Sequence, residues 1–199
     1  MILGITGGTG CGKTTLLRML EDAGVLVLDC DAIYHQLLKT DTSVLGAIEA
    51  RFPGTVENGT LQRKKLGAIV FADAAALEDL NRITHGAIRQ EVLRRMAAWK
   101  GHIAIDAIAL FESGLAQLCD ITVAVTAPRE DRILRLMARD NISREYAQSR
   151  VAAQHEDSWF CQRCHHILEN NTDLDAFAMK CLAFLDQLGI IKRKKGESL

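Results

Sequence analysis

The segment that decides the fold is Gly7–Thr14, which reads GGTGCGKT. It matches G-x-x-x-x-G-K-[ST], the pattern of a phosphate-binding loop (P-loop), with Lys13 and Thr14 in the last two positions. The run at residues 1–6 is short and apolar, as in a buried strand, and residues 15–20 carry apolar side chains at helical spacing. The sequence therefore predicts a strand, a tight glycine turn and a helix, in that order.

A glycine turn in this context predicts a site for a nucleoside triphosphate. Glycine adopts positive φ and has no side chain, so consecutive backbone N–H groups can point into one hollow, where the helix N-terminus adds partial positive charge. Lys13 can reach the β- and γ-phosphates, and the Thr14 hydroxyl can bind Mg²⁺. The alternative is a glycine-rich turn without a ligand. The residues expected to contact the nucleotide are Gly8, Thr9, Gly10, Cys11, Gly12, Lys13, Thr14 and Thr15.

The composition is that of an ordinary soluble domain of 199 residues, 48% of them hydrophobic and 25% charged. The formal net charge of −1 does not favour a broad nucleic-acid surface, and no apolar run approaches membrane-spanning length. The N-terminus reads as a core strand rather than a signal sequence, and six scattered cysteines favour reduced thiols. We therefore expect a cytoplasmic protein without nucleic-acid or membrane partners, and a solvated tail at Lys192–Lys195.

Two acids follow the second predicted strand. Val25–Leu28 is a short apolar run that ends in Asp29-Cys30-Asp31. Because open parallel sheets carry their chemistry beyond the carboxyl ends of the strands, both acids should face the same crevice as the P-loop. A carboxylate there can accept a proton from an attacking hydroxyl or hold Mg²⁺ through water. The alternative is that an acid only caps the next helix, and we expect each role to belong to one of the pair.

Residues 32–100 interrupt the alternation of strands and helices. Helical patterns are predicted at 32–39, 44–52, 63–71 and 77–99, with a turn-rich link between the second and third. A long helical excursion between two strands is an inserted lobe, which in a kinase holds the acceptor. Basic side chains that could meet an anionic acceptor are Arg63, Lys64, Lys65, His85 and Arg89, and all but Arg63 and His85 fit a solvated surface better.

The remaining strands are predicted at 102–110, 121–125 and 166–169, and a last helix at 174–188. The first of these strands is apolar except for Asp106, which could be the Mg²⁺-linked acid of a strand of Walker B type, although its place within the run is not decisive. With the strands at 1–6 and 25–28, the sequence predicts a five-stranded parallel sheet flanked by helices.

A helix predicted at 130–140 has arginines along one side. Arg132, Arg135 and Arg139 are spaced by three and four residues, and Arg144 and Arg150 continue the series over a polar segment. Guanidinium groups suit phosphate oxygens, and the segment could close as a lid that excludes water. The alternative is that the arginines only keep an exposed helix soluble.

Two cysteine features suggest further chemistry. The run Cys161-Gln162-Arg163-Cys164-His165-His166 matches C-x-x-C-H and has side chains that zinc binds, but a closed site would need both histidines to turn inward. A run leading into a strand without a metal is favoured. Cys11 lies at a predicted helix N-terminus, where its pKa should be lowered and its thiol reactive. A serine substitute without consequence is the favoured alternative there.

With these segments in place, the chain resembles the dephospho-CoA kinase family over most of its length. The loop TGGTGCGKTT matches the family's TGG-x-G-x-GK-[ST]-T, with Cys11 where serine is usual. Leu28–Asp31 resembles the family's D-A-D segment, whose second acid falls on Asp31. Further segments that resemble family motifs in the same order are Asn58–Arg63, Thr84-His85, Asp106–Glu112, Arg135 with Arg139-Asp140, Arg150–Gln154 and Ile167–Asn171.

The resemblance implies that ATP phosphorylates the ribose 3′-hydroxyl of dephospho-CoA in the presence of Mg²⁺, giving CoA and ADP. It implies that Asp31 is the base, that Lys13 neutralises charge and that Arg139 stabilises the transition state. The other implied site residues are Asp29, Arg63, His85 and Asp106 for the acceptor, Arg135 and Arg150 in the lid, and Asn171 near the adenine.

The implied architecture is a single P-loop NTPase-type kinase domain. Its core would comprise residues 1–31, 101–137 and 156–199, with an acceptor-binding helical lobe at about 32–100 and a helical lid at about 138–155. One alternative is a P-loop kinase for another nucleoside or small alcohol. The other is a nucleotide-dependent switch or binding protein, against which the chain has no N-K-x-D guanine-reading motif. The sequence sets no oligomeric state.

Overall fold

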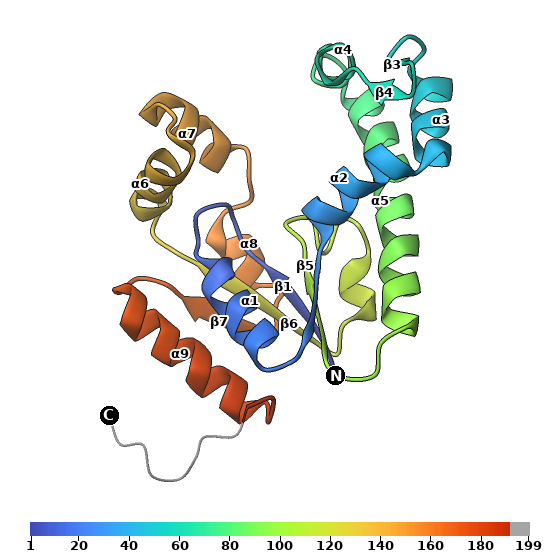
Figure 1. Cartoon of the computed structure of the whole chain (residues 1–199). Helices are drawn as coiled ribbons and strands as arrows, with labels where there is room; N and C mark the ends of the chain where they lie inside the picture. Colours follow the sequence, from blue (N-terminus) through green and yellow to red (C-terminus); the bar gives the residue numbers. More distant parts are fainter. Residues whose placement is uncertain (192–199) are drawn as a thin grey trace.

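A computed structural model of the protein describes residues 1–191 and confirms the five-stranded parallel sheet (Figure 1). The strand order is β2-β5-β1-β6-β7. The strands are β1 (Ile2–Thr6), β2 (Leu26–Asp29), β5 (Ile103–Asp106), β6 (Ile121–Thr126) and β7 (His166–Glu169). The P-loop strand β1 is central, and its parallel neighbours are β5 and β6. The central position places the P-loop in the middle of the carboxyl edge of the sheet.

Helices cover both faces of the sheet, as a parallel sheet requires. On one face α1 (Lys13–Asp22) and α9 (Leu174–Gln187) pack against each other and on the strands. Leu16, Leu20, Phe177 and Cys181 of these helices are fully buried in one core with alternate strand residues such as Ile5. On the other face, a second core contains β5 residues of opposite orientation, the C-terminal half of α5 and the short helix η1 (Leu115–Leu118).

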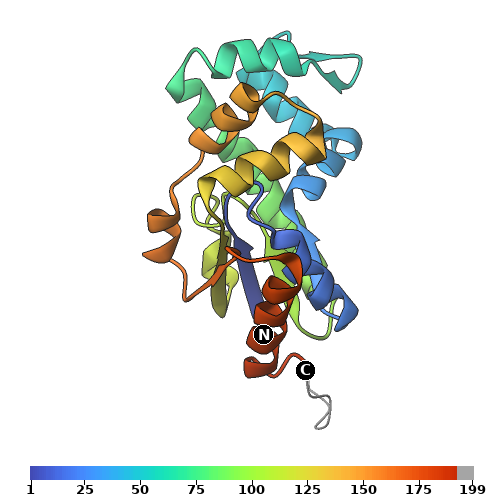
Figure 2. The same cartoon turned by 90° about the vertical axis from the view of Figure 1, so that its left-hand side faces the viewer.

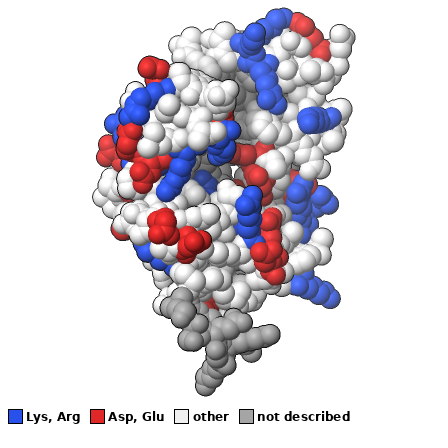
Figure 3. Space-filling model, turned by 60° about the vertical axis from the view of Figure 1, so that its left-hand side comes forward, with Lys and Arg blue, Asp and Glu red and all other residues white. Residues whose placement is uncertain are grey.

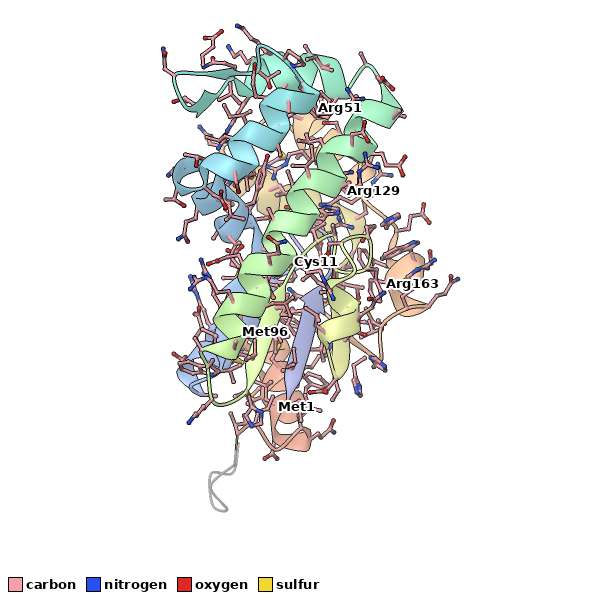
Figure 4. The ribbon with its side chains drawn as sticks, turned by 90° about the vertical axis from the view of Figure 1, so that its right-hand side faces the viewer. Met1, Cys11, Arg51, Met96, Arg129 and Arg163 are labelled. Atoms are coloured by element: carbon pink, nitrogen blue, oxygen red, sulfur yellow. The ribbon has the colours of Figure 1, made fainter. Side chains whose placement is uncertain are left out.

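The long segment between β2 and β5 forms a helical lobe beyond the sheet (Figure 1). It contains α2 (Cys30–Thr40), α3 (Thr42–Arg51), α4 (Arg63–Val70), α5 (Ala74–Ala97) and a hairpin of β3 (Val56–Glu57) and β4 (Thr60–Leu61). The lobe has its own core, which includes Ile48, Phe52 and Leu66. Helix α5 runs from this lobe to the sheet, where Met96 lies near its end (Figure 4).

The hairpin replaces part of the turn-rich link that the sequence predicts. Asn58 and Gly59 both adopt positive φ, 50° and 72° respectively. Two such residues in succession form the turn whose twist matches a two-residue antiparallel hairpin, and Asn-Gly is the dipeptide that best adopts it.

After β6 the chain forms α6 (Arg129–Asp140) and α7 (Arg144–Ala152), joined at Asn141 in the left-handed conformation with φ 51°. Ile133, Leu136, Ala147 and Val151 bury the contact between the two helices. The pair stands across the end of the sheet from the helical lobe (Figure 1), and α6 passes above the loop that follows β1 (Figure 2).

One predicted strand end was wrong. The strand expected at 102–110 ends at Asp106, where the ladders with β1 and β2 both end, and only the N–H of Ala107 continues the pairing by donating to the carbonyl of Ile5 at 3.1 Å. A short helix, α8 (Asp157–Cys161), occupies part of the cysteine-containing run and buries Phe160. The basic run Lys192–Lys195 lies outside the described residues.

The packing of α9 predicts a large difference between two leucines of that helix. Leu185 is fully buried and Leu174 is 67% exposed. We expect Leu185→Ala to lower the free energy of unfolding by about 2–5 kcal/mol, and Leu174→Ala, the control, by less than about 1 kcal/mol. Urea denaturation measures both values. Equal losses for the two variants would mean that α9 does not pack on the sheet as described.

Candidate active site

A cavity of about 880 Å³ lies at the carboxyl ends of β1, β2 and β5. It is lined by the P-loop, the three acids Asp29, Asp31 and Asp106, and the arginine-bearing helices α6 and α7. Figure 3 shows a hollow on this face with basic side chains on one side and acidic side chains on the other. Seven of the predicted nucleotide-binding residues line it: Gly8, Thr9, Gly10, Cys11, Gly12, Lys13 and Thr14.

The P-loop follows the edge of the sheet too closely to allow side chains at its glycines. A Cβ atom at Gly7, whose φ is 127°, would lie 2.1 Å from the carbonyl oxygen of Val125. A Cβ atom at Gly12, whose φ is 97°, would lie 2.3 Å from Nδ2 of Asn170. The Nζ of Lys13 donates to the carbonyl of Gly7 at 2.8 Å, so its ammonium lies over the loop. The arrangement is a cradle of main-chain amides with one ammonium group, which suits a polyphosphate.

The three acids have different surroundings: Asp29 caps α2, whereas Asp31 and Asp106 line the cavity without capping a helix. Oδ1 of Asp29 accepts a 2.9 Å hydrogen bond from the backbone N–H of Ala32 and caps α2. Asp31 is exposed in the first turn of the same helix, where the helix dipole favours its charge. Asp29 is therefore the acid of this pair that caps the helix, and Asp31 lines the cavity without serving as the cap.

Asp106 is held at the end of β5. Burial raises the pKa of its carboxyl to about 6; Lys13 opposes the shift, and the charges of Asp29 and Asp31 reinforce it. Its Oδ1 is buried without a hydrogen-bond partner among residues 1–191. A buried carboxylate oxygen costs free energy unless it is paired or coordinates a metal. Together with the Thr14 hydroxyl in the same cavity, the donor set fits a hard divalent cation such as Mg²⁺.

An acid holds two of the predicted lid arginines. Asp140 accepts from Nε and Nη2 of Arg139 at 2.7 and 3.0 Å and from Nη1 of Arg150 at 2.5 Å. These hydrogen bonds lower the pKa of the Asp140 carboxyl well below its usual range. Arg135, Arg139 and Arg150 all line the cavity. Three guanidinium groups therefore face the cavity from the side of α6 and α7.

A second cavity, of about 250 Å³, adjoins the first. The two share Asp31, Ala107 and Ile108 as lining residues. The second is mainly apolar and includes Tyr34, with His85 as a polar group. Burial lowers the pKa of His85, against the raising effect of Glu112, so the imidazole is neutral near pH 7. A third cavity, of about 530 Å³, shares Asn81, His85 and Ser113 with the second.

Three predicted site residues line none of these cavities: Thr15, Arg63 and Asn171. Nη2 of Arg63 lies 3.3 Å from Nδ1 of His35 on the lobe. Asn171 is exposed, and its Oδ1 accepts from Nζ of Lys180 at 3.0 Å. These three residues remain predictions.

Sequence reasoning missed three residues that contact the P-loop. Nε of Arg132 donates to the carbonyl of Thr9 at 3.0 Å, and Nδ2 of Asn170 donates to the carbonyl of Cys11 at 2.9 Å. Oε1 of Gln154 accepts from the backbone N–H of Thr9 at 2.8 Å. The spacing of the arginines by three and four residues placed Arg132 on the same side of the helix as Arg135 and Arg139. This spacing does not predict which of the three arginines is buried.

The lowered pKa expected for Cys11 was wrong. The thiol is fully buried in the core beneath the loop, and that burial raises its pKa despite the nearby charges of Arg132 and Lys13. Cys11 therefore contributes its backbone to the cradle. In the C-x-x-C-H run, Nδ1 of His165 bonds to Thr122. Within residues 1–191, no three His, Cys, Asp or Glu side chains are grouped to hold a metal ion.

Comparisons with known proteins agree with the geometry. A family model described as dephospho-CoA kinase matches residues 1–176. The dephospho-CoA kinase of Deinococcus radiodurans is 38% identical over 192 residues, 94% of this chain and 92% of that protein. That of Moorella thermoacetica is 37% identical over 182 residues, 88% of this chain and 86% of that protein. The crystal structure of TT1252 from Thermus thermophilus superposes with a TM-score of 0.80 at 31% identity, covering 94% and 97% of the two chains.

The raised pKa of Asp106 predicts how stability depends on pH. Between its unfolded pKa of about 4 and its folded pKa the native state holds the extra proton, so the carboxyl makes the protein less stable as pH rises. The neutral variant Asp106→Asn does not lose stability in this way as pH rises. We expect its free energy of unfolding to exceed that of the parent protein by about 1–3 kcal/mol at pH 8, and by less at pH 4.5. Urea denaturation at both pH values measures this, and a pH-independent difference would contradict it.

Proposed function

The chain belongs to the dephospho-CoA kinase family, and on that premise we propose that it transfers the terminal phosphoryl group of ATP to the ribose 3′-hydroxyl of dephospho-CoA. The products are CoA and ADP, and the reaction is the last step of CoA biosynthesis. The observation that carries the proposal is the position of Asp31, which lines both the P-loop cavity and the mainly apolar cavity beside it. A base at such a boundary can meet a donor from one side and an acceptor from the other.

The P-loop holds the donor in this proposal. The backbone of residues 10–15 surrounds the β- and γ-phosphates, and the ammonium of Lys13 moves from the carbonyl of Gly7 to the phosphate oxygens. The Thr14 hydroxyl and the carboxylate of Asp106 would hold Mg²⁺, and the bound cation would neutralise charge on the phosphates. The arginines Arg135, Arg139 and Arg150 face the same space and stabilise the charge that develops during transfer.

The second cavity receives the nucleoside of the acceptor. Its walls are mainly apolar, with Tyr34 and the neutral imidazole of His85 available to an aromatic base, and Asp31 at its inner end orients and deprotonates the hydroxyl. We assign residues 32–100 to the acceptor lobe, 138–155 to the lid and the rest to the core. Arg63 would contact a part of the acceptor that extends beyond the cavity, because it lies on the same lobe at the start of α4 and does not line the cavity itself.

The cellular site of this activity is proposed to be the cytoplasm. All six cysteines are free thiols in the structure, which fits a reducing compartment. Across the described part of the chain, no helix has the length and apolar character needed to span a membrane.

An acceptor panel tests the proposed reaction. Purified protein with ATP and Mg²⁺ should form ADP when dephospho-CoA is added, and much less with adenosine, AMP or shikimate. Mass spectrometry should show a product heavier by one phosphoryl group. ADP formation at the same rate without any acceptor would instead favour a nucleotide-dependent switch, and preference for another alcohol would favour a different kinase.

Asp31→Asn tests the base. The amide keeps the size of the side chain but cannot accept the proton, so we expect kcat to fall by a factor of about 10²–10⁴ while ATP binding is unchanged. The matched control is Asp22→Asn, at an exposed position at the end of α1, with unchanged kcat. Steady-state kinetics and ATP titration give both quantities. Turnover that stays at the parent level in Asp31→Asn would remove this residue from the role.

His85→Ala tests the acceptor cavity. Loss of the imidazole removes contact surface from the second cavity but leaves the P-loop intact. We expect the KM for dephospho-CoA to rise about tenfold, the KM for ATP to stay within a factor of about two, and kcat to change less than in Asp31→Asn. A rise confined to the KM for ATP would place the acceptor elsewhere.

A further inference from the structure

The carbonyl groups of the P-loop are all hydrogen-bonded, and those of Thr9, Gly10 and Cys11 accept from side chains outside the loop and α1. Every carbonyl from Gly7 to Gly12 accepts a hydrogen bond. The donors are Nζ of Lys13 to Gly7 and Gly8, Nε of Arg132 to Thr9 (3.0 Å), Nη1 of Arg135 to Gly10 (3.3 Å), Nδ2 of Asn170 to Cys11 (2.9 Å) and the backbone N–H of Thr15 to Gly12 (3.1 Å). Side chains from α6 and from the residue that follows β7 thus bind three successive carbonyls of the loop.

The orientation of these carbonyls fixes the orientation of the amides. In a planar trans peptide unit the C=O of one residue and the N–H of the next point in opposite directions. A carbonyl of Thr9 turned toward Arg132 therefore turns the N–H of Gly10 away from Arg132, and a carbonyl of Cys11 turned toward Asn170 turns the N–H of Gly12 away from Asn170. The side chains that bind these carbonyls thereby help to set the direction of the next main-chain donors.

Arg132 is the best buried member of this arrangement. It is 4% exposed, and besides Thr9 it donates through Nη2 to Oε1 of Gln154 at 2.8 Å. The same Oε1 accepts the N–H of Thr9 at 2.8 Å, so both backbone groups of Thr9 are fixed by this pair. The nearest carboxylate, that of Asp157, lies 3.8 Å away. Burying a guanidinium with so little charge pairing costs free energy. Here Nε donates to the loop and Nη2 donates to Gln154, which itself binds the loop.

The contact between Arg132 and the loop is close. A Cβ atom at Gly8 would lie 2.1 Å from Nη2 of Arg132, and one at Gly10 would lie 2.8 Å from its carbonyl oxygen. Asn170 is similarly enclosed: it is 6% exposed, its Oδ1 accepts from Nη2 of Arg135 at 3.4 Å, and its backbone N–H donates to the carbonyl of Thr126 at 2.8 Å. Both side chains are therefore held in place by the core as well as by the loop.

We propose that Arg132, Gln154 and Asn170, here called the outer frame, are positioning residues that hold the P-loop amides toward the phosphates of the nucleotide. Gln154 follows α7 and so connects this frame to the segment assigned as the lid. The outer frame does not touch the acceptor cavity, because none of its three members lines it. The inference rests on the proposed nucleotide site but does not depend on which acceptor is used.

The test compares ATP binding in variants of two arginines of one helix. Arg132→Met removes the donors and keeps an apolar stem, Arg132→Lys keeps a charged donor, and Arg129→Met, at an exposed position three residues earlier in α6 (Figure 4), is the control. Isothermal titration with ATP and Mg²⁺, without acceptor, gives Kd. Thermal unfolding without nucleotide gives Tm for each variant.

Arg132→Met should raise Kd for ATP about 10- to 100-fold, which corresponds to the loss of a charge-assisted hydrogen bond, and Arg132→Lys should give an intermediate value. Arg129→Met should leave Kd unchanged. In steady-state kinetics, the KM for ATP should rise in Arg132→Met and the KM for the acceptor should not. A lower Tm with an unchanged Kd would show that Arg132 only stabilises the fold, and would overturn the proposal.

Gln154→Ala provides a second variant should Arg132→Met fail to fold. Gln154 is half-buried, and its loss frees the N–H of Thr9 and one donor of Arg132. We expect Kd for ATP to rise about two- to tenfold, as for one uncharged hydrogen bond, with Tm nearly unchanged. An unchanged Kd would overturn the role of Gln154. If the parent protein binds ATP but does not phosphorylate dephospho-CoA, the proposed reaction fails while these comparisons still decide the role of the outer frame.

Discussion

The parallel pairing of β5 with both β1 and β2 is the constraint on which the rest of the structure depends. The register places Asp106 opposite Asp29 on one side and opposite Ile5 on the other. Strands β2 and β5 therefore end at one level, and β1 extends one residue beyond that level, to Thr6, before the loop begins. A slip of one residue in either pairing would turn Asp106 to the opposite face of the sheet, away from the ammonium of Lys13. The fold thus fixes the distance between the phosphate cradle and the acids before any ligand arrives.

Burial has a larger effect than ion pairing on the protonation of Asp106 at this edge of the sheet. Lys13 lowers the pKa of Asp106, yet desolvation is the larger effect and leaves the carboxyl partly protonated in the slightly acidic range. On the opposite wall Asp140 holds two guanidinium groups at once, which keeps them near the cavity without neutralising both. Positive charge therefore collects on one wall and acidic groups on the other, the separation that phosphoryl transfer to a hydroxyl requires.

The sequence was sufficient for the fold and for the centre of the site. The P-loop pattern, the five apolar strand segments and the acids after the second strand predicted the sheet, its parallel direction and the shared crevice. The sequence did not predict which individual side chains are buried, because tertiary packing determines this. Asn170 and Asn171 are adjacent residues just beyond β7, and the backbone bond from Asn170 to Thr126 continues the alternation of the strand, so that the first is buried and the second is exposed. The helix N-terminus at Cys11 was visible, but the burial of its thiol, which reverses the expected direction of its pKa, was not. The spacing of the arginines did not predict that Arg132, and not Arg139, would be buried, because its burial depends on contact with the P-loop.

Helix α5 has a mechanical consequence for the molecule. It is 24 residues long, about 36 Å, and it is continuous: Ala76 lies in the core of the helical lobe and Val92 in the core of the sheet. One continuous helix therefore packs in two hydrophobic cores. Tilting the lobe relative to the sheet would disrupt the apolar contacts at the C-terminal end of α5. The pair α6–α7 has a separate small core of four buried residues, and its side-chain hydrogen bonds to the sheet end include those from Arg132 and Arg135 to the carbonyls of Thr9 and Gly10. One side of the cleft is therefore joined to the sheet by the apolar packing of one continuous helix, and the other side by polar contacts with the P-loop.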